Sequence, residues 1–133
     1  MKHVLVVEDD PHNAALFHKI LEKRAGYRVT VTENAAEILR LAAGGEVDLV
    51  ILDVSLGNTR LDGQAVSGVE LCQRLKSDAR TVGIPVLLAT AHAMRGDCER
   101  LLAESGADDY VSKPILDHAL FAAQVRAHLN EAA

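Results

Sequence analysis

Six polar or charged side chains stand directly after short strand-like segments of this sequence. They are Glu8, Asp9, Asp10, Asp53, Thr90 and Lys113. If these segments are parallel strands of one open sheet, their carboxyl ends meet at one edge, which is where such sheets bind ligands. We therefore expect carboxylates, a hydroxyl and an ammonium group to gather at one site.

The charges of this expected site indicate its chemistry. Packed carboxylates repel one another, so a cation is needed to neutralise them. All-oxygen ligands favour a hard ion, Mg²⁺ first and Mn²⁺ as the alternative. A carboxylate beside such an ion can attack a phosphoryl group and form an aspartyl phosphate. The metal and a lysine would stabilise the charge on the transferring oxygens. The residue types therefore fit phosphoryl transfer to an aspartate.

The segments before these side chains have the pattern of buried strands. Residues 4–7, 49–52 and 84–88 are nearly continuous runs of Val, Ile and Leu. Runs without alternation are typical of strands buried on both faces of a parallel sheet. Residues 27–32 alternate and predict a more exposed strand, and residues 109–112 are a brief fifth candidate.

Helical spacing and helix-end residues lie between the strands. Asp10 before Pro11 is a good start for a first helix, and Asn34 for a second. Val69 lies in a third, a fourth ends near Gly106, and Pro114 is expected to open the last. Five alternating strands and helices predict an α/β fold of (βα)5 type, with helices on both faces of a parallel sheet.

Composition excludes several classes of protein. The 133 residues suit one domain, and 14 Lys+Arg against 19 Asp+Glu give a net charge of -5. This charge and the lack of Trp argue against direct nucleic-acid binding. No apolar run is long enough for membrane insertion, and the N-terminus has no signal-peptide pattern. Two cysteines outside any paired motif fit a cytoplasmic location.

Four motifs in order resemble the receiver domain of two-component response regulators. They are VLVVEDDP at 4–11, DLVILD at 48–53, IPVLLATAHA at 84–93 and ADDYVSKPI at 107–115. The resemblance covers nearly the whole chain. It implies a flavodoxin-like three-layer sandwich whose five-stranded sheet has the order 2-1-3-4-5. We expect residues 1–133 to be one receiver domain without an attached output domain.

The resemblance also implies a role for each site residue. Asp53 is the expected phospho-acceptor, with Thr90 and Lys113 beside the phosphate. The expected metal ligands are the side chains of Glu8, Asp9 and Asp53 and the backbone carbonyl of Ser55. Thr90 and Tyr110 are the expected switch residues. The expected phosphoryl donor is a sensor histidine kinase or a phosphotransfer protein, and the output is phosphorylation-dependent binding to another protein.

One segment departs from the family pattern. Receivers carry a glycine about eight residues after the acceptor, whereas the matching Gly68 lies fifteen residues after Asp53. We interpret this as about seven inserted residues in a polar loop, with Gly63 as a competing alignment.

The sequence also bears on three alternative functions and on roles of surface residues. A haloacid-dehalogenase-type phosphatase would need a second Asp where Ser55 stands, and a flavin carrier would need a phosphate-binding loop where three acids stand. A non-phosphorylated interaction module is the other alternative. A homodimer through the fourth helix, fifth strand and fifth helix is expected from the resemblance, with Arg126 as a candidate partner residue. Asp108 and Asp109 are interpreted as a solvated turn.

Overall fold

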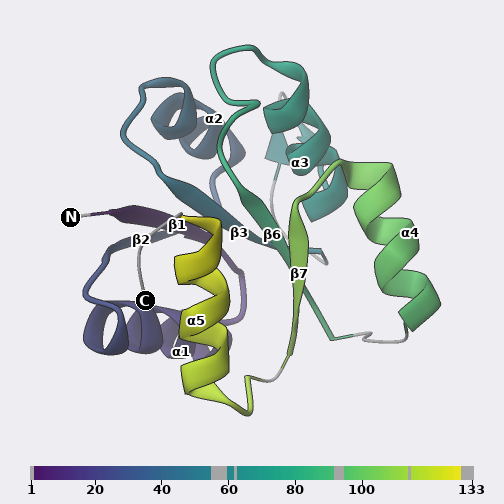
Figure 1. Cartoon of the computed structure of the whole chain (residues 1–133). Coiled ribbons are helices and arrows are strands. Elements are labelled where there is room, and N and C mark those ends of the chain that lie inside the picture. The colour runs from purple at the N-terminus through teal and green to yellow at the C-terminus, as the bar shows by residue number, and fades with distance from the viewer. Residues whose placement is uncertain (1, 55–59, 62, 92–94, 114, 130–133) are drawn as a thin grey trace.

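A five-stranded parallel sheet forms the centre of the fold (Figure 1). The computed structural model describes residues 2–54, 60–61, 63–91, 95–113 and 115–129. The strands of the sheet are β1 (His3–Val7), β2 (Arg28–Thr32), β3 (Leu49–Asp53), β6 (Val86–Thr90) and β7 (Asp109–Ser112). Their spatial order is β2-β1-β3-β6-β7, which is the predicted 2-1-3-4-5 order of these five strands. The predicted flavodoxin-like fold is confirmed.

Helices cover both faces of the sheet (Figure 1). They are α1 (Pro11–Lys19), its π-helical continuation η1 (Ile20–Arg24), α2 (Ala35–Ala43), α3 (Gly68–Ser77), α4 (Arg95–Ser105) and α5 (His118–His128). Asp10 and Asn34 cap α1 and α2 as predicted, because their side chains accept hydrogen bonds from the first-turn amides. None of the described helices has the length and apolarity that crossing a membrane would require.

Alternate residues of the three central strands, β1, β3 and β6, supply two separate cores. Val4, Val6 and Ile51 pack with side chains of α1, η1 and α5, including Phe17 and Phe121. On the other face, the intervening strand residues pack with side chains of α2 and α3. Strand residues buried on both faces explain the continuous apolar runs in the sequence. This double packing holds the carboxyl ends of the strands in place.

The loop after β3 contains a small hairpin that was not predicted. Strands β4 (Arg60–Leu61) and β5 (Gln64–Ala65) pair antiparallel, with Arg60 opposite Ala65. Gly63, at φ +80°, lies between them in a left-handed conformation that favours glycine. Only two residues pair on each side, too few for a recognisable alternating pattern.

Two local interpretations of the sequence were wrong. The last helix begins at His118 rather than near Pro114, which lies outside the described residues, because Asp117 caps it by accepting from the Leu120 amide at 2.9 Å. Asp109 is not part of a solvated turn, because it begins β7 and its carboxylate lies 2.9 Å from His128 of α5. Asp108 is exposed in a bend, as predicted, and its carboxylate also pairs with Lys76 of α3.

Candidate functional site

Strand register brings the predicted residues to one edge of the sheet. Leu52, just before Asp53, lies opposite Val7, just before Glu8. Asp53 lies opposite Ala89 of β6, and Thr90 opposite Ser112 of β7. Because parallel strands end at the same edge, residues far apart in sequence become neighbours there.

An ammonium group joins two buried carboxylates at this edge. Lys113 Nζ lies 3.0 Å from Glu8 Oε1 and 3.2 Å from Asp53 Oδ1. Glu8 and Asp53 are each 4% exposed. The backbone amide of Lys113 also donates to the Thr90 carbonyl at 2.8 Å, which anchors the lysine next to the end of β6. Charge pairing explains how two buried acids coexist here.

Carboxylate oxygens also converge in a way that suits a cation. One oxygen each from Glu8, Asp9 and Asp53 lies within 4.8 Å of the others. Oxygen ligands at this spacing match the preference of Mg²⁺. Ser55, whose backbone carbonyl was the other predicted ligand, lies outside the described residues.

Burial perturbs the protonation of the site. It raises the pKa of Glu8 from 4.5 to about 7, helped by the hydrogen bond with Asp53 and opposed by Lys113. Burial lowers the pKa of Lys113, but Glu8 and Asp53 outweigh this effect and the pKa is raised overall. Lys113 therefore stays charged, while the Glu8 carboxyl takes up a proton more readily than an exposed glutamate does.

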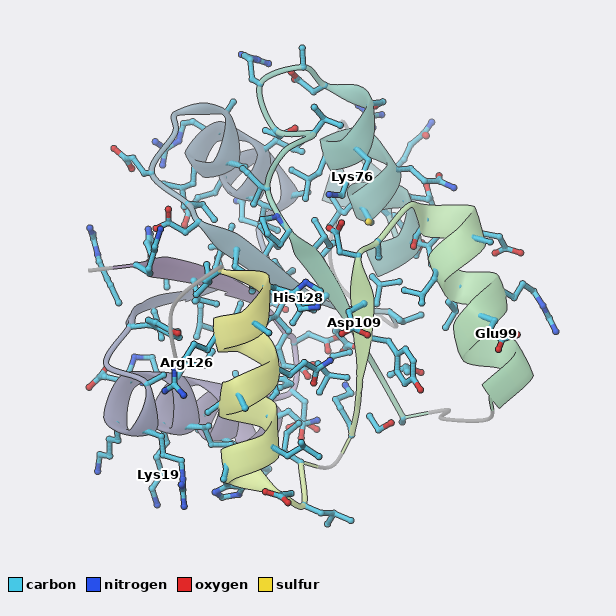
Figure 2. The ribbon with its side chains drawn as sticks, viewed as in Figure 1. Lys19, Lys76, Glu99, Asp109, Arg126 and His128 are labelled. Atoms are coloured by element: carbon cyan, nitrogen blue, oxygen red, sulfur yellow. The ribbon has the colours of Figure 1, made fainter. Side chains whose placement is uncertain are left out.

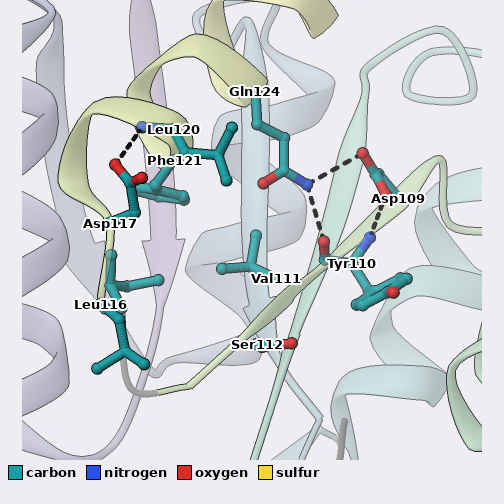
Figure 3. Close-up of a pocket in the computed structure, with 10 residues that line it drawn as sticks. Asp109, Tyr110, Val111, Ser112, Leu116, Asp117, Leu120, Phe121 and Gln124 are labelled. Atoms are coloured by element: carbon teal, nitrogen blue, oxygen red, sulfur yellow. Dashed lines mark hydrogen bonds between the residues drawn. The ribbon is translucent and has the colours of Figure 1, made fainter. Parts of the chain in front are cut away.

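The two predicted switch residues lie on adjacent strands. Thr90 ends β6 and is 2% exposed. Tyr110 is half-buried on β7, which pairs with β6. Figure 3 shows Tyr110 beside a pocket of about 440 Å³ between β7 and α5, which Leu116 and Leu120 also line.

Gly68 touches the backbone of Asp53 from the start of α3. A Cβ atom on Gly68 would collide with the Asp53 carbonyl oxygen and lie 2.8 Å from the Asp53 carbonyl carbon. The Gly68 amide donates to the Val54 carbonyl at 3.2 Å. Gly63 has no such neighbour. The close approach selects Gly68 over Gly63 as the glycine that the site requires.

Replacing Gly68 with alanine is expected to destabilise the protein by about 1–3 kcal/mol, because the backbone of Asp53 or the start of α3 must move. Urea unfolding of both proteins measures the difference. Gly83 provides a matched control: a Cβ there meets nothing within 4 Å, so Gly83→Ala is expected to change stability by less than about 0.5 kcal/mol. Equal stability of the two variants would contradict the proposed close packing.

The site and the fold together identify the class of this protein. The response regulator receiver domain family matches residues 4–125, and the chain belongs to this family. It is therefore a signalling domain that accepts a phosphoryl group, and histidine kinases or phosphotransfer proteins are the partners of this family. The phosphatase, flavin-carrier and non-phosphorylated alternatives are set aside.

Particular relatives agree with this assignment. The chain is 40% identical over 114 residues to the polar-differentiation response regulator DivK of Brucella anthropi, covering 86% of this chain and 85% of that protein. The Brucella ovis protein of the same name is 39% identical over the same length.

Two solved structures share the fold. The receiver domain of sensor histidine kinase PA1611 from Pseudomonas aeruginosa, with a magnesium ion coordinated in its active site cleft, has a TM-score of 0.80 at 25% identity. The match covers 98% of each chain. A putative response regulator from Chloroflexus aurantiacus has a TM-score of 0.81 at 27% identity, covering 96% of this chain and 97% of that one.

Proposed function

We propose that Asp53 is the phosphoryl acceptor of this receiver domain. The observation that supports it most directly is the pairing of Asp53 with Lys113 at 3.2 Å, next to the Glu8 and Asp9 carboxylates. In the transfer, an Asp53 Oδ atom forms a bond to phosphorus while the bond from phosphorus to the donor's imidazole nitrogen breaks. The electron pair of that broken bond leaves with the nitrogen.

Glu8, Asp9 and Asp53 are the side chains that would hold Mg²⁺, with Mn²⁺ as a substitute and the Ser55 carbonyl as a further ligand. When bound, the ion neutralises negative charge on the phosphoryl oxygens. Lys113 holds Asp53 in place and supplies a second positive charge to the same oxygens. Together they allow an anionic carboxylate to approach an anionic phosphoryl group.

Thr90 and Tyr110 are proposed to report the phosphorylated state. The Thr90 hydroxyl would donate to the new phosphoryl group, and Tyr110 would respond on the neighbouring strand. The pairing of Thr90 with Ser112 supports this route, because a shift at the end of β6 is felt by β7. We also propose that the same site promotes the phosphorylation of Asp53 by small donors and the later hydrolysis of the aspartyl phosphate.

The proposed function is tested with a small phosphodonor such as acetyl phosphate. The protein is expected to gain the mass of one phosphoryl group with Mg²⁺ and none with a chelator. Rapid loss of the group in base would identify an acyl phosphate. Absence of any mass gain with Mg²⁺ would overturn the proposal.

The raised pKa of Glu8 predicts how metal binding depends on pH. In the unfolded chain Glu8 ionises near 4.5, but in the folded metal-free protein it does so near 7. The folded state thus binds more protons between these values, so this stabilisation is lost as pH rises through about 7. The ionised carboxylate would hold Mg²⁺, and this binding would compensate for the loss.

Added Mg²⁺ is therefore expected to raise the melting temperature more at about pH 8 than at about pH 5.5. Thermal unfolding followed by circular dichroism measures both shifts. Glu8→Gln is the control, because it removes the titrating ligand and should make the Mg²⁺ effect small at both values. A larger Mg²⁺ effect at the lower pH would contradict the prediction.

We propose that the phosphorylated domain signals by binding other proteins, and that it forms a homodimer through the face made by α4, β7 and α5. Leu116 and Leu120 support it, since they are 89% and 68% exposed beside the pocket of Figure 3. Arg126 points away from β7 in Figure 2, so it is a poor candidate for this interface. Sedimentation of wild type and Leu120→Glu with a phosphoryl mimic tests it, and a single monomer mass for wild type would disprove it. We also propose that this receiver domain works in the cytoplasm.

A further inference from the structure

A network of three side chains ties α5 to β7 at the end of the pocket. His128 Nε2 lies 2.9 Å from Asp109 Oδ2, and Gln124 Nε2 donates to the same oxygen at 3.0 Å. Gln124 Nε2 also donates to the Tyr110 backbone carbonyl at 2.8 Å, as drawn in Figure 3. Figure 2 shows Asp109 and His128 facing one another across β7 and α5. We call Asp109, Gln124 and His128 the α5 latch.

The latch occupies the backbone groups of Tyr110. β7 is the outer strand of the sheet and pairs with β6. The Tyr110 amide donates to Asp109 Oδ1 at 2.8 Å, while its carbonyl accepts from Gln124. Side chains thus satisfy hydrogen-bonding groups that an edge strand otherwise presents to solvent or to another strand. The side-chain amide of Gln124 therefore links the position of Tyr110 to that of α5.

The latch joins β7 to α5 at one end of the pocket. Gln124 and His128 are one helical turn apart and therefore lie on the same side of α5. At the opposite end of the pocket, Asp117 caps the first turn of α5, next to the exposed Leu116 and Leu120. Hydrogen bonds at the latch end can act as a hinge about which the apolar end opens or closes.

We propose that Gln124 is a positioning residue that transmits a displacement of Tyr110 to α5 and so sets the width of the pocket between β7 and α5. This inference rests on the proposed role of Tyr110 as a switch residue. Its physical basis is that Gln124 Nε2 is shared between a strand carbonyl and the Asp109 carboxylate, so the strand cannot move at Tyr110 without straining or releasing α5. A carboxylate acceptor strengthens the anchor.

A purely structural role for Gln124 would stabilise the fold without carrying the signal. The two roles are separated by measuring the response of α5 rather than stability alone. The chain offers a matched control in Gln73, whose Nε2 donates to the Glu104 carbonyl at 2.8 Å and ties α3 to α4. Gln73→Leu removes an equivalent helix-to-backbone bond elsewhere in the same protein.

The test compares wild type, Gln124→Leu, Gln124→Glu and Gln73→Leu by NMR, with beryllium fluoride and Mg²⁺ as the phosphoryl mimic at Asp53. The reporters are the ring signals of Tyr110 and the backbone amides of Ala123 and Val125 on α5. The protein has 2 tyrosines, so a Tyr27→Phe background assigns the ring signals of Tyr110. We expect wild type and Gln73→Leu to respond at both reporters. Gln124→Leu should respond at Tyr110, with an α5 response weaker by about fivefold, the effect of one lost hydrogen bond.

Each other outcome identifies what has failed. An unchanged α5 response in Gln124→Leu and Gln124→Glu overturns the transmission proposal, and so does an equal loss in Gln73→Leu. If the mimic binds wild type but Tyr110 does not respond, the proposed switch role of Tyr110 and the transmission fail, while phospho-acceptance stands. If the mimic does not bind and acetyl phosphate adds no mass, the proposed function itself fails.

Discussion

Replacing Asp53 with asparagine is expected to abolish phosphoryl uptake from acetyl phosphate. An amide oxygen is a far weaker nucleophile than a carboxylate, and the change also removes one of the three negative charges that would hold the metal. The fold should survive, because asparagine has nearly the same shape and can still accept a hydrogen bond from Lys113. Intact-mass measurement after incubation with Mg²⁺ gives the result directly.

Asp10 provides the matched control for this experiment. It lies next to the acidic pair, but its side chain caps α1 by accepting from the His12 amide at 2.8 Å. Asparagine caps helices about as well as aspartate, so Asp10→Asn should keep both stability and phosphoryl uptake. Uptake at the wild-type level by Asp53→Asn would place the acceptor elsewhere.

Replacing Lys113 with methionine is expected to slow phosphorylation by about 100- to 1,000-fold, because a preorganised charge on the transferring oxygens is lost. Glu8 and Asp53 would then lie together without the ammonium group that now contacts both. Glu8 can take up a proton, since its pKa is already about 7. The variant should therefore fold, and at a pH well above the pKa of Glu8 it should bind Mg²⁺ more tightly than wild type because a competing cation has been removed.

This opposite effect on metal affinity and reaction rate separates a role in transfer from general damage to the site. Rates come from the time course of mass gain, and Mg²⁺ affinity from isothermal titration. Lys76→Met is the control: Lys76 also forms an ion pair, at 2.8 Å from Asp108, but at the opposite end of the sheet. Its loss should reduce stability and leave phosphorylation of the folded protein unchanged. Weaker Mg²⁺ binding by Lys113→Met would contradict the electrostatic argument.

Much of the fold and the site could be predicted because their signals are local. Residues buried on both faces of a parallel strand read as continuous Val, Ile and Leu runs, and the residue after each run marks an end of the sheet. Asp10 and Asn34 cap the helices at which they were expected. Glu8, Asp9, Asp53 and Lys113 could therefore be placed together without knowing a single contact.

Other features depend on contacts between segments far apart in the chain. The sequence around Asp108 predicts an acidic turn and no partner for its carboxylate. In the structure, Asp108 Oδ2 accepts hydrogen bonds from Lys76 Nζ and from the Val86 amide, both at 2.8 Å. Gln124 has no motif around it, and its role follows only from where α5 packs against β7. A pattern of residue types contains no information on which polar side chain finds which distant partner.

The amino-acid sequence by itself determined the order of the five sheet strands and their helices, and an acidic edge suited to phosphoryl chemistry, because hydrophobic periodicity and residue type act locally. Tertiary structure decided which glycine the site needs, since only the collision of a Cβ at Gly68 with the Asp53 carbonyl separates it from Gly63. Tertiary structure likewise formed the α5 latch, because hydrogen bonds between Tyr110 or Asp109 and side chains of α5 exist only after the helix docks.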